Sequence, residues 1–92
     1  MYQIEYHEKI VDDLARISET NKTRIRKAIE SKLMLNPIIF GKPLQNSLRN
    51  FRSTRVGEYR IIFMVQGKKV RILNISHRSF VYSIAKIRAM RT

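Results

Sequence analysis

Two short stretches of the sequence combine arginines with aromatic residues. They are residues 51–60 (FRSTRVGEYR) and residues 77–82 (HRSFVY). An arginine guanidinium is a planar fork of hydrogen-bond donors that matches a phosphate group and keeps its charge at any working pH. Aromatic rings beside it can stack on unpaired bases. The two stretches therefore predict a surface that binds nucleic acid through its phosphates and its bases.

Arg60 is the first candidate for a chemical role. Strand alternation places its side chain on the same face as Ile62 and Met64, which is a partly buried surface. An arginine in such a place normally requires an anion or a hydrogen-bond partner. An anionic substrate would meet that need. The alternative is a structural pair with Glu58, which lies two positions earlier on the same face.

Three residues of the second stretch are further candidates. Arg78 and Tyr82 are four residues apart, so they share one side of a helix if helical geometry already holds there. A tyrosine beside cations could transfer a proton or simply pack. His77 could act as a general acid or base near neutral pH. Strand alternation, however, directs it inward after Leu73 and Ile75, where it would be a histidine at the edge of the core.

The charge of the chain points to an acidic or polyanionic partner. Nineteen Lys and Arg residues against seven Asp and Glu residues give a net charge of +12. Every acidic residue lies at or before Glu58, so the C-terminal third is purely cationic. Nucleic acid is the first partner to expect from such a charge, and a solvated surface that keeps the protein soluble is the alternative.

The composition excludes many kinds of site. The sequence contains no cysteine, which removes disulfides, thiolate zinc sites and cysteine nucleophiles, and fits a reducing cytoplasm. It has no glycine-rich phosphate loop, no HExxH motif and only two histidines, so no metal and no cofactor is expected. The longest apolar run, residues 61–65, is far shorter than the roughly 20 residues that cross a bilayer. We therefore expect a cytoplasmic protein without a membrane segment.

Hydrophobic periodicity predicts an α+β fold in a single domain over residues 1–92. Period-two patterns indicate strands over residues 2–6, 48–56, 58–66 and 69–76. Helical spacing indicates a helical hairpin whose first helix spans residues 8–19, whose second helix begins near Thr20 and Asn21, and which ends at Asn36-Pro37. A short helix follows from Val81. The hairpin should cover one face of a mainly antiparallel sheet and the last helix the other, with Asp12, Asp13 and Arg16 facing away from the core.

Three blocks of the sequence together resemble the RelE/ParE toxins of type II toxin–antitoxin systems. They are residues 36–44 (NPIIFGKPL), 55–63 (RVGEYRIIF) and 75–82 (ISHRSFVY), and the resemblance covers essentially the whole chain in order. It implies a compact sheet with a helical hairpin, similar to small microbial ribonucleases. It also implies an endoribonuclease that cuts mRNA in the A site of the 70S ribosome without a metal, and an acidic RelB-like antitoxin that forms a hetero-oligomer with the toxin.

The resemblance also implies roles for individual residues. Arg60 matches the arginine that stabilises the pentacovalent transition state, and Arg78 the arginine near the leaving group. Tyr82 matches the C-terminal tyrosine of proton transfer and base stacking. The residues implied to contact RNA are Phe51, Arg52, Arg55 and Lys86, although Arg52 and Arg55 could also be solvated charges at the sheet edge.

The sequence departs from the family pattern where a general base is expected. RelE-like ribonucleases often carry two lysines spaced by one residue, whereas this chain has Arg52 and Thr54, and Ser53 stands where many relatives have arginine. Arginine is too basic to accept a proton near neutral pH. The candidates for the proton acceptor are therefore Tyr82, His77 and Glu58. A non-catalytic, ParE-like inhibitor of DNA gyrase is the alternative function on the same scaffold.

Overall fold

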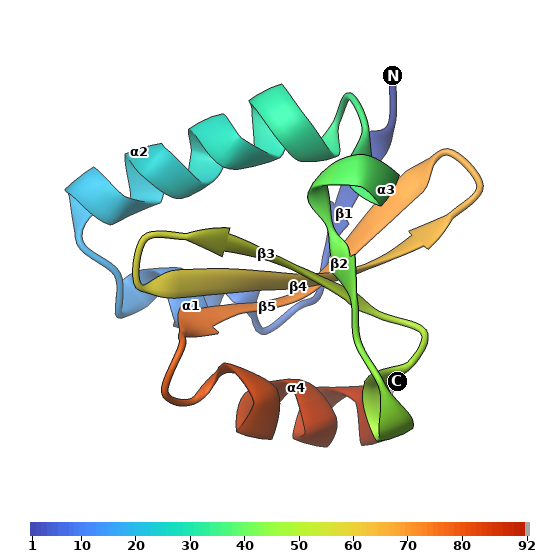
Figure 1. Cartoon of the computed structure of the whole chain (residues 1–92). Coiled ribbons are helices and arrows are strands. Elements are labelled where there is room, and N and C mark those ends of the chain that lie inside the picture. Colours follow the sequence, from blue (N-terminus) through green and yellow to red (C-terminus); the bar gives the residue numbers. More distant parts are fainter. Residues whose placement is uncertain (92) are drawn as a thin grey trace.

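A computed structural model of the protein describes residues 1–91 and contains one five-stranded sheet in the order β1-β5-β4-β3-β2 (Figure 1). β1 is parallel to β5, and the other neighbours are antiparallel. The strands are β1 (Gln3–Tyr6), β2 (Lys42–Pro43), β3 (Arg52–Val56), β4 (Tyr59–Gln66) and β5 (Lys69–His77). The helices are α1 (Ile10–Ala15), α2 (Glu19–Ala28), α3 (Pro37–Phe40) and α4 (Val81–Met90), with a π-helical turn (Ile29–Leu33) after α2 and a 3₁₀ turn (Asn46–Leu48) before β3.

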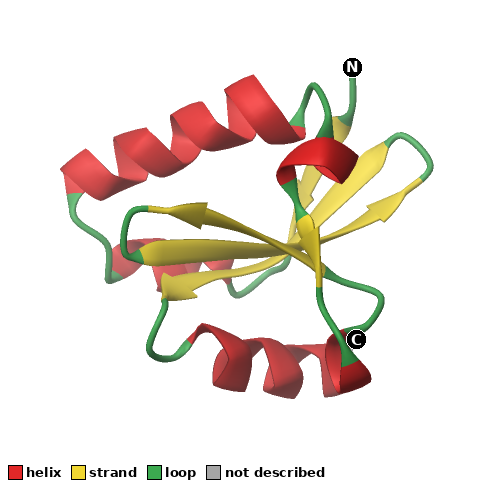
Figure 2. Cartoon of the chain, in the orientation of Figure 1, coloured by secondary structure: helices red, strands yellow, loops and turns green. Residues whose placement is uncertain are grey.

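The sheet lies between two helical layers, as the sequence predicted (Figure 2). On one face α1 and α2 pack over a large apolar cluster that includes Ile25, Leu33 and Phe63. On the other face α4 packs over a smaller cluster around Ile62 and Val81. The middle of β4 is therefore covered on both faces. Among the described helices, none has the length and apolarity that a membrane crossing needs.

The helical hairpin differs from the prediction at several boundaries. Its first helix spans only Ile10–Ala15 and not residues 8–19. The second helix begins at Glu19, because the hydroxyl of Ser18 accepts a hydrogen bond from the backbone N–H of Asn21 and caps the helix before Thr20 is reached. Beyond the predicted end of the hairpin at Asn36-Pro37 the chain forms one more short helix, α3, because Asn36 caps it in the same way. The predicted strand from residue 48 begins only at residue 52, because a 3₁₀ turn occupies its first part.

An irregularity in the pairing of β4 with β5 moves one residue to the other face. Ile62 pairs with Asn74, whereas Phe63 pairs with Ile72, so Leu73 is an extra residue on β5. Leu73 consequently joins the cluster under α4, while Ile75 joins the cluster under α1 and α2. The expectation that these two side chains share a face was wrong, because simple alternation does not anticipate a bulge.

A buried ion pair completes the edge of β5 where β1 ends. β1 pairs with β5 only as far as Ile72. Beyond it, the carboxylate of Asp13 accepts a hydrogen bond of 3.0 Å from the backbone N–H of Ile75, and Arg88 donates one of 3.0 Å to the carbonyl of Leu73. Asp13 and Arg88 also form a bidentate salt bridge, with both N···O distances 2.7 Å. The prediction that Asp13 faces away from the core was wrong, because its partner lies at the other end of the chain. We call this ion pair the edge clamp.

Loss of the edge clamp should destabilise the protein. In the Asp13→Ala variant, Arg88 would stay largely buried without its counter-charge, and the N–H of Ile75 would lose its acceptor. Removing one partner of a buried pair costs about 3–5 kcal/mol, a large part of the stability of a small domain. Urea denaturation would measure the free energy of unfolding.

The matched control is Glu19→Ala, which removes an exposed carboxylate paired with Lys22. Exposed pairs contribute about 0–1 kcal/mol, so this variant should unfold almost like the wild type. Equal destabilisation by Asp13→Ala and Glu19→Ala would contradict a structural role for the clamp.

Candidate functional site

Arg60 lies on the face of the sheet that α4 covers. It is directly opposite Arg55 on β3 and Ser76 on β5, and residues opposite each other across a sheet share a face. The side chain of Arg60 is half-buried and forms no hydrogen bond or salt bridge with any residue of the described chain. The alternative pair with Glu58 is therefore not formed. A half-buried guanidinium in this state has its full capacity to bind an anion.

Arg78 is held beside the turn between β3 and β4. Its backbone N–H donates a hydrogen bond of 2.8 Å to the carbonyl of Glu58, and its Nε lies 3.2 Å from the Glu58 carboxylate. Arg55 folds back on the same turn, with Nε donating to the carbonyl of Gly57 at 3.2 Å. Gly57 has a φ of +60°, a conformation that glycine adopts without strain. Three arginines thus come together around one tight turn and the strand that follows it.

A fourth arginine at this turn was missed by the sequence analysis. The guanidinium of Arg24, from α2, lies so close to Gly57 that a Cβ there would be 2.9 Å from its Nη1. Arg24 belongs to a helix that the sequence places far from the arginine-rich stretches. No local pattern could have connected it to them, because only the packing of α2 against β3 does so.

Tyr82 and Lys86 lie on the flank of α4 that faces β4 and β3. Val81 and Ala85 point into the core, and Ile84 and Arg88 line the opposite flank, along the edge of β5. Helical periodicity therefore directs Tyr82 and Lys86 to the other side. Tyr82 is 37% exposed, and neither side chain forms a hydrogen bond or salt bridge within residues 1–91. The start of α4 is fixed, because the buried amide of Asn74 donates to the carbonyl of Val81 at 3.1 Å.

The two other predicted proton acceptors lie in different surroundings. His77 pairs with Tyr59 across the sheet, on the face opposite to Arg60, and the two rings meet edge to face at 5.7 Å. Its Nδ1 accepts a hydrogen bond of 3.1 Å from the backbone N–H of Ser79. The carboxylate of Glu58 is exposed and paired with Arg78. The structure thus brings Glu58 to the edge of the site and leaves His77 outside it.

Phe51 and Arg52, both predicted to contact RNA, make contacts within the fold. Phe51 packs against the cluster under α4. Arg52 points to the other face of the sheet, where its Nη1 donates to the carbonyls of Ile38 and Gly41 at 3.3 and 3.0 Å. Arg52 thereby ties β3 to α3. Neither residue joins the surface formed by Arg55, Arg60, Arg78, Tyr82 and Lys86, which we call the cationic face.

Two buried polar side chains lie on the same sheet face as Arg60, beneath α4. Ser53 and Asn74 lie opposite Ile62 on its two sides, so all three share the face of Arg60. The Oγ of Ser53 and the Oδ1 of Asn74 are buried, and neither has a hydrogen-bond partner in the described structure. Within residues 1–91, no three histidine or acidic side chains are grouped as a metal ion would require. The chemistry that this face offers is binding and stabilisation of negative charge by arginines, with a phenol at its border.

One tyrosine outside the cationic face has a shifted pKa. Burial first, and then the negative charge of Glu30, raises the pKa of Tyr6 above the usual value of 10.0. Both effects disfavour the phenolate. Tyr6 therefore stays protonated at neutral pH and cannot supply a base.

Comparison with known proteins identifies the family. Residues 4–82 match the family model described as the ParE toxin of the type II toxin–antitoxin system parDE. The Mycobacterium tuberculosis protein Toxin RelE is 33% identical over 72 residues, which are 76% of this chain and 74% of that protein. The toxin–antitoxin complex RelBE2 of M. tuberculosis contains a chain with a TM-score of 0.78 and 25% identity, over 84% of this chain and 98% of that one. A mutant of the Escherichia coli toxin RelE has the same fold, with a TM-score of 0.73 and 17% identity over 95% of this chain and 96% of that one. The protein therefore belongs to the RelE/ParE superfamily and is a toxin of the type II toxin–antitoxin kind.

Proposed function

We propose that the protein is a ribosome-dependent endoribonuclease that cleaves mRNA in the ribosomal A site and so inhibits translation. The observation that carries this proposal is Arg60, a half-buried guanidinium without a partner in the described chain, on the sheet face that α4, the helix of Tyr82, covers. A protein that needs only a basic surface has no reason to keep a charge partly buried and unpaired. An enzyme that stabilises charge on a phosphate does have one.

In the proposed reaction the 2′-hydroxyl of one nucleotide attacks the phosphate that follows it. The 2′-hydroxyl loses its proton as a bond forms between the 2′-oxygen and phosphorus, the bond to the 5′-oxygen breaks, and that oxygen takes up a proton, so that a cyclic phosphate and a 5′-hydroxyl result. Arg60 stabilises the negative charge that builds up on the phosphate oxygens. Arg78 does the same for the leaving oxygen. Since arginines supply the positive charge, the proposed chemistry needs no metal.

Tyr82 is our candidate for proton transfer. His77 faces the other side of the sheet, and the carboxylate of Glu58 is bound to Arg78, so both are less suited to the task. The phenol of Tyr82 is exposed and has no hydrogen-bond partner within residues 1–91, and its ring can also stack on a base. Arg55 and Lys86 would hold neighbouring phosphates. A ribosomal target would place the protein in the cytoplasm.

An acidic antitoxin is the second proposed partner. The solved relatives include a RelB–RelE antitoxin–toxin complex from Methanococcus jannaschii, with a TM-score of 0.70, and the RelBE2 complex. A net charge of +12 on 92 residues is self-repulsive and favours an acidic chain as a ligand. We propose that such an antitoxin forms a hetero-oligomer with this protein.

The alternative function is inhibition of DNA gyrase. The matched family model is that of a ParE toxin, which is an observation for this alternative, while the relative Toxin RelE is one for the ribonuclease. The two functions differ in their products. Primer extension on ribosome-bound mRNA detects cleavage, and a supercoiling assay detects gyrase inhibition. A protein that inhibits supercoiling and leaves mRNA intact would contradict our proposal.

The first functional prediction concerns Arg60. Arg60→Ala should lower the rate of mRNA cleavage by about 10²–10³, the usual effect of losing one donor to a charged transition state. The melting temperature should stay near that of the wild type, because Arg60 holds no partner in the described fold. Single-turnover cleavage of a programmed ribosome measures the rate.

The control is Arg26→Ala, which removes an exposed arginine from α2. A fully active Arg60→Lys variant together with an unfolded Arg60→Ala variant would show a structural role instead.

The second functional prediction separates the hydroxyl of Tyr82 from its ring. Tyr82→Phe should slow cleavage by about 10²–10⁴ if the hydroxyl transfers a proton, while ribosome binding persists. Tyr82→Ala should lose more, because stacking worth about 1–3 kcal/mol per base goes with the ring. The same single-turnover assay compares both variants with the wild type. Equal rates for all three would remove Tyr82 from the reaction and make Glu58 the next candidate.

The antitoxin proposal predicts a gain in thermal stability. An acidic partner that binds only the folded toxin stabilises it by RT ln(1 + L/Kd), where L is the free concentration of the partner, so the melting temperature should rise with the logarithm of that concentration above Kd. Added salt should weaken the complex, since charge complementarity supports association. Differential scanning calorimetry with and without the co-encoded acidic protein measures both effects. A melting temperature unchanged by that protein would count against the proposal.

A further inference from the structure

A groove of about 560 Å³ runs along the edge of β5 between α1 and α4, outside the cationic face. This volume lies within the usual range of small-ligand sites. Buried Ile17 and Ile75 line it, and the edge clamp belongs to its wall. The reaction proposed above uses none of these residues.

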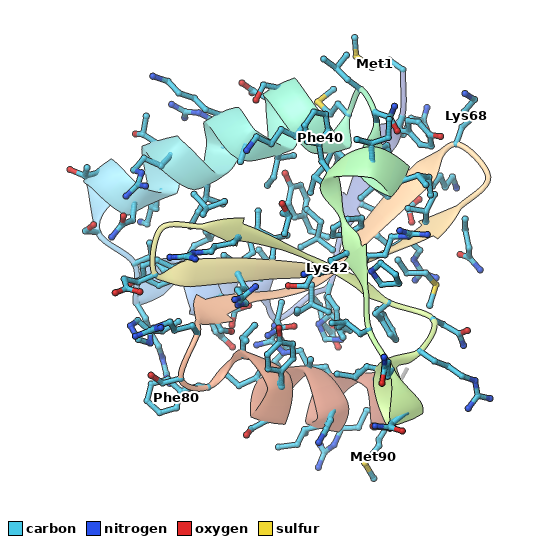
Figure 3. All side chains as sticks on the ribbon, in the orientation of Figure 1. Met1, Phe40, Lys42, Lys68, Phe80 and Met90 are labelled. Carbon is cyan, nitrogen blue, oxygen red and sulfur yellow. The ribbon has the colours of Figure 1, made fainter. Side chains whose placement is uncertain are left out.

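Aromatic rings form one end of the groove. Phe80 is 62% exposed, and its ring centroid lies 6.2 Å from that of His77, which in turn meets Tyr59. Phe80 stands at the turn before α4, with its ring at the periphery of the molecule (Figure 3). An exposed phenylalanine ring is a stacking platform for a flat ligand such as a base.

Polar side chains with open hydrogen-bonding capacity line the rest of the groove. Within residues 1–91, the side chains of Asp12, Arg16 and Ser83 form no hydrogen bond or salt bridge. Asp12 only accepts hydrogen bonds, Arg16 only donates them, and Ser83 does both. Nδ1 of His77 is already an acceptor, so the neutral ring carries its proton on Nε2 and can donate there. A flat ligand with donors and acceptors around its edge matches this set.

We propose that this groove is a subsite for one nucleobase of the RNA, that of a nucleotide next to the cleaved one. Phe80 stacks on the base, and Asp12 and Arg16 bind its edge and its phosphate. This inference rests on the proposed ribonuclease function. The turn at residues 78–80 connects the two sites, because Arg78 is bound to Glu58 at the cationic face and Phe80 opens onto the groove. An RNA strand that crosses this turn reaches both.

A segment of an acidic protein is the competing occupant of the groove. Asp12 argues against it, since an acidic peptide would meet an unpaired carboxylate there. A nucleotide avoids this conflict, because a base can donate its amino group to Asp12 while its phosphate lies at Arg16. We therefore assign the groove to a base.

The test is a titration followed by NMR, with adenosine monophosphate and ribose 5-phosphate as probes. The nucleotide should shift the backbone amide signals of Ser79 and Ser83 in a saturable way, whereas ribose 5-phosphate, which has no base, should leave them in place. Phe80→Ala should weaken nucleotide binding about 10- to 100-fold, in line with the loss of one stacked base, and Phe80→Trp should preserve it. The matched control is Phe40→Ala, which removes an exposed ring beside α3, far from the groove (Figure 3).

The outcomes separate this inference from the proposed function. Shifts that are the same for both probes, or nucleotide binding that does not depend on Phe80, would overturn the subsite. Shifts caused only by an acidic peptide would assign the groove to a protein partner and overturn it as well. A wild type that binds the nucleotide here through Phe80 but cleaves no ribosome-bound mRNA would support a nucleobase site in the groove and would contradict the ribonuclease, and with it the assignment of a cleaved neighbour.

Discussion

A carboxylate from the first helix and a guanidinium from the last one meet at the edge of β5 that β1 leaves open, and the two helical layers depend on this contact. Asp13 accepts from the backbone of β5 and Arg88 donates to it, so together they replace the missing strand. Since α1 lies on one face of the sheet and α4 on the other, the pair joins both layers around the edge. The edge clamp therefore helps to hold α4, and with it Tyr82, in place against the sheet.

One face of the sheet supplies most of the apolar burial, and the other carries the candidate functional site. The face under α1 and α2 holds the larger apolar cluster and supplies most of the burial. The face under α4 has a smaller cluster, and it places polar and charged residues such as Ser53, Asn74 and Arg60 between the strands and the helix. A protein of 92 residues has little apolar surface to bury, and here the larger of its two apolar clusters takes most of it. The site therefore lies where the packing is thinner.

The sequence was sufficient for the architecture and for part of the candidate site. Period-two and helical patterns predicted the helical layers and four of the five strands but missed the two-residue β2, and alternation placed Arg60 correctly because β4 is regular up to Ile62. Alternation failed at Leu73, where a bulge adds a residue. It also failed for Asp13, because a partner 75 positions away decides its burial. Arg24 could not be found for the same reason: the contact with Gly57 exists only in three dimensions.

The parallel pairing of β1 with β5 has a consequence for the order in which the chain folds. β1 is made first, yet its only neighbour in the sheet begins at Lys69, and the ion pair at the edge needs Arg88. Contacts between such distant segments form late, since a long loop must close before they give any stabilisation. During synthesis the emerging chain therefore lacks the last strand and helix that its cationic face requires. The cationic face and the edge clamp are therefore complete only once the chain has been synthesised through α4, the last element that both of them need.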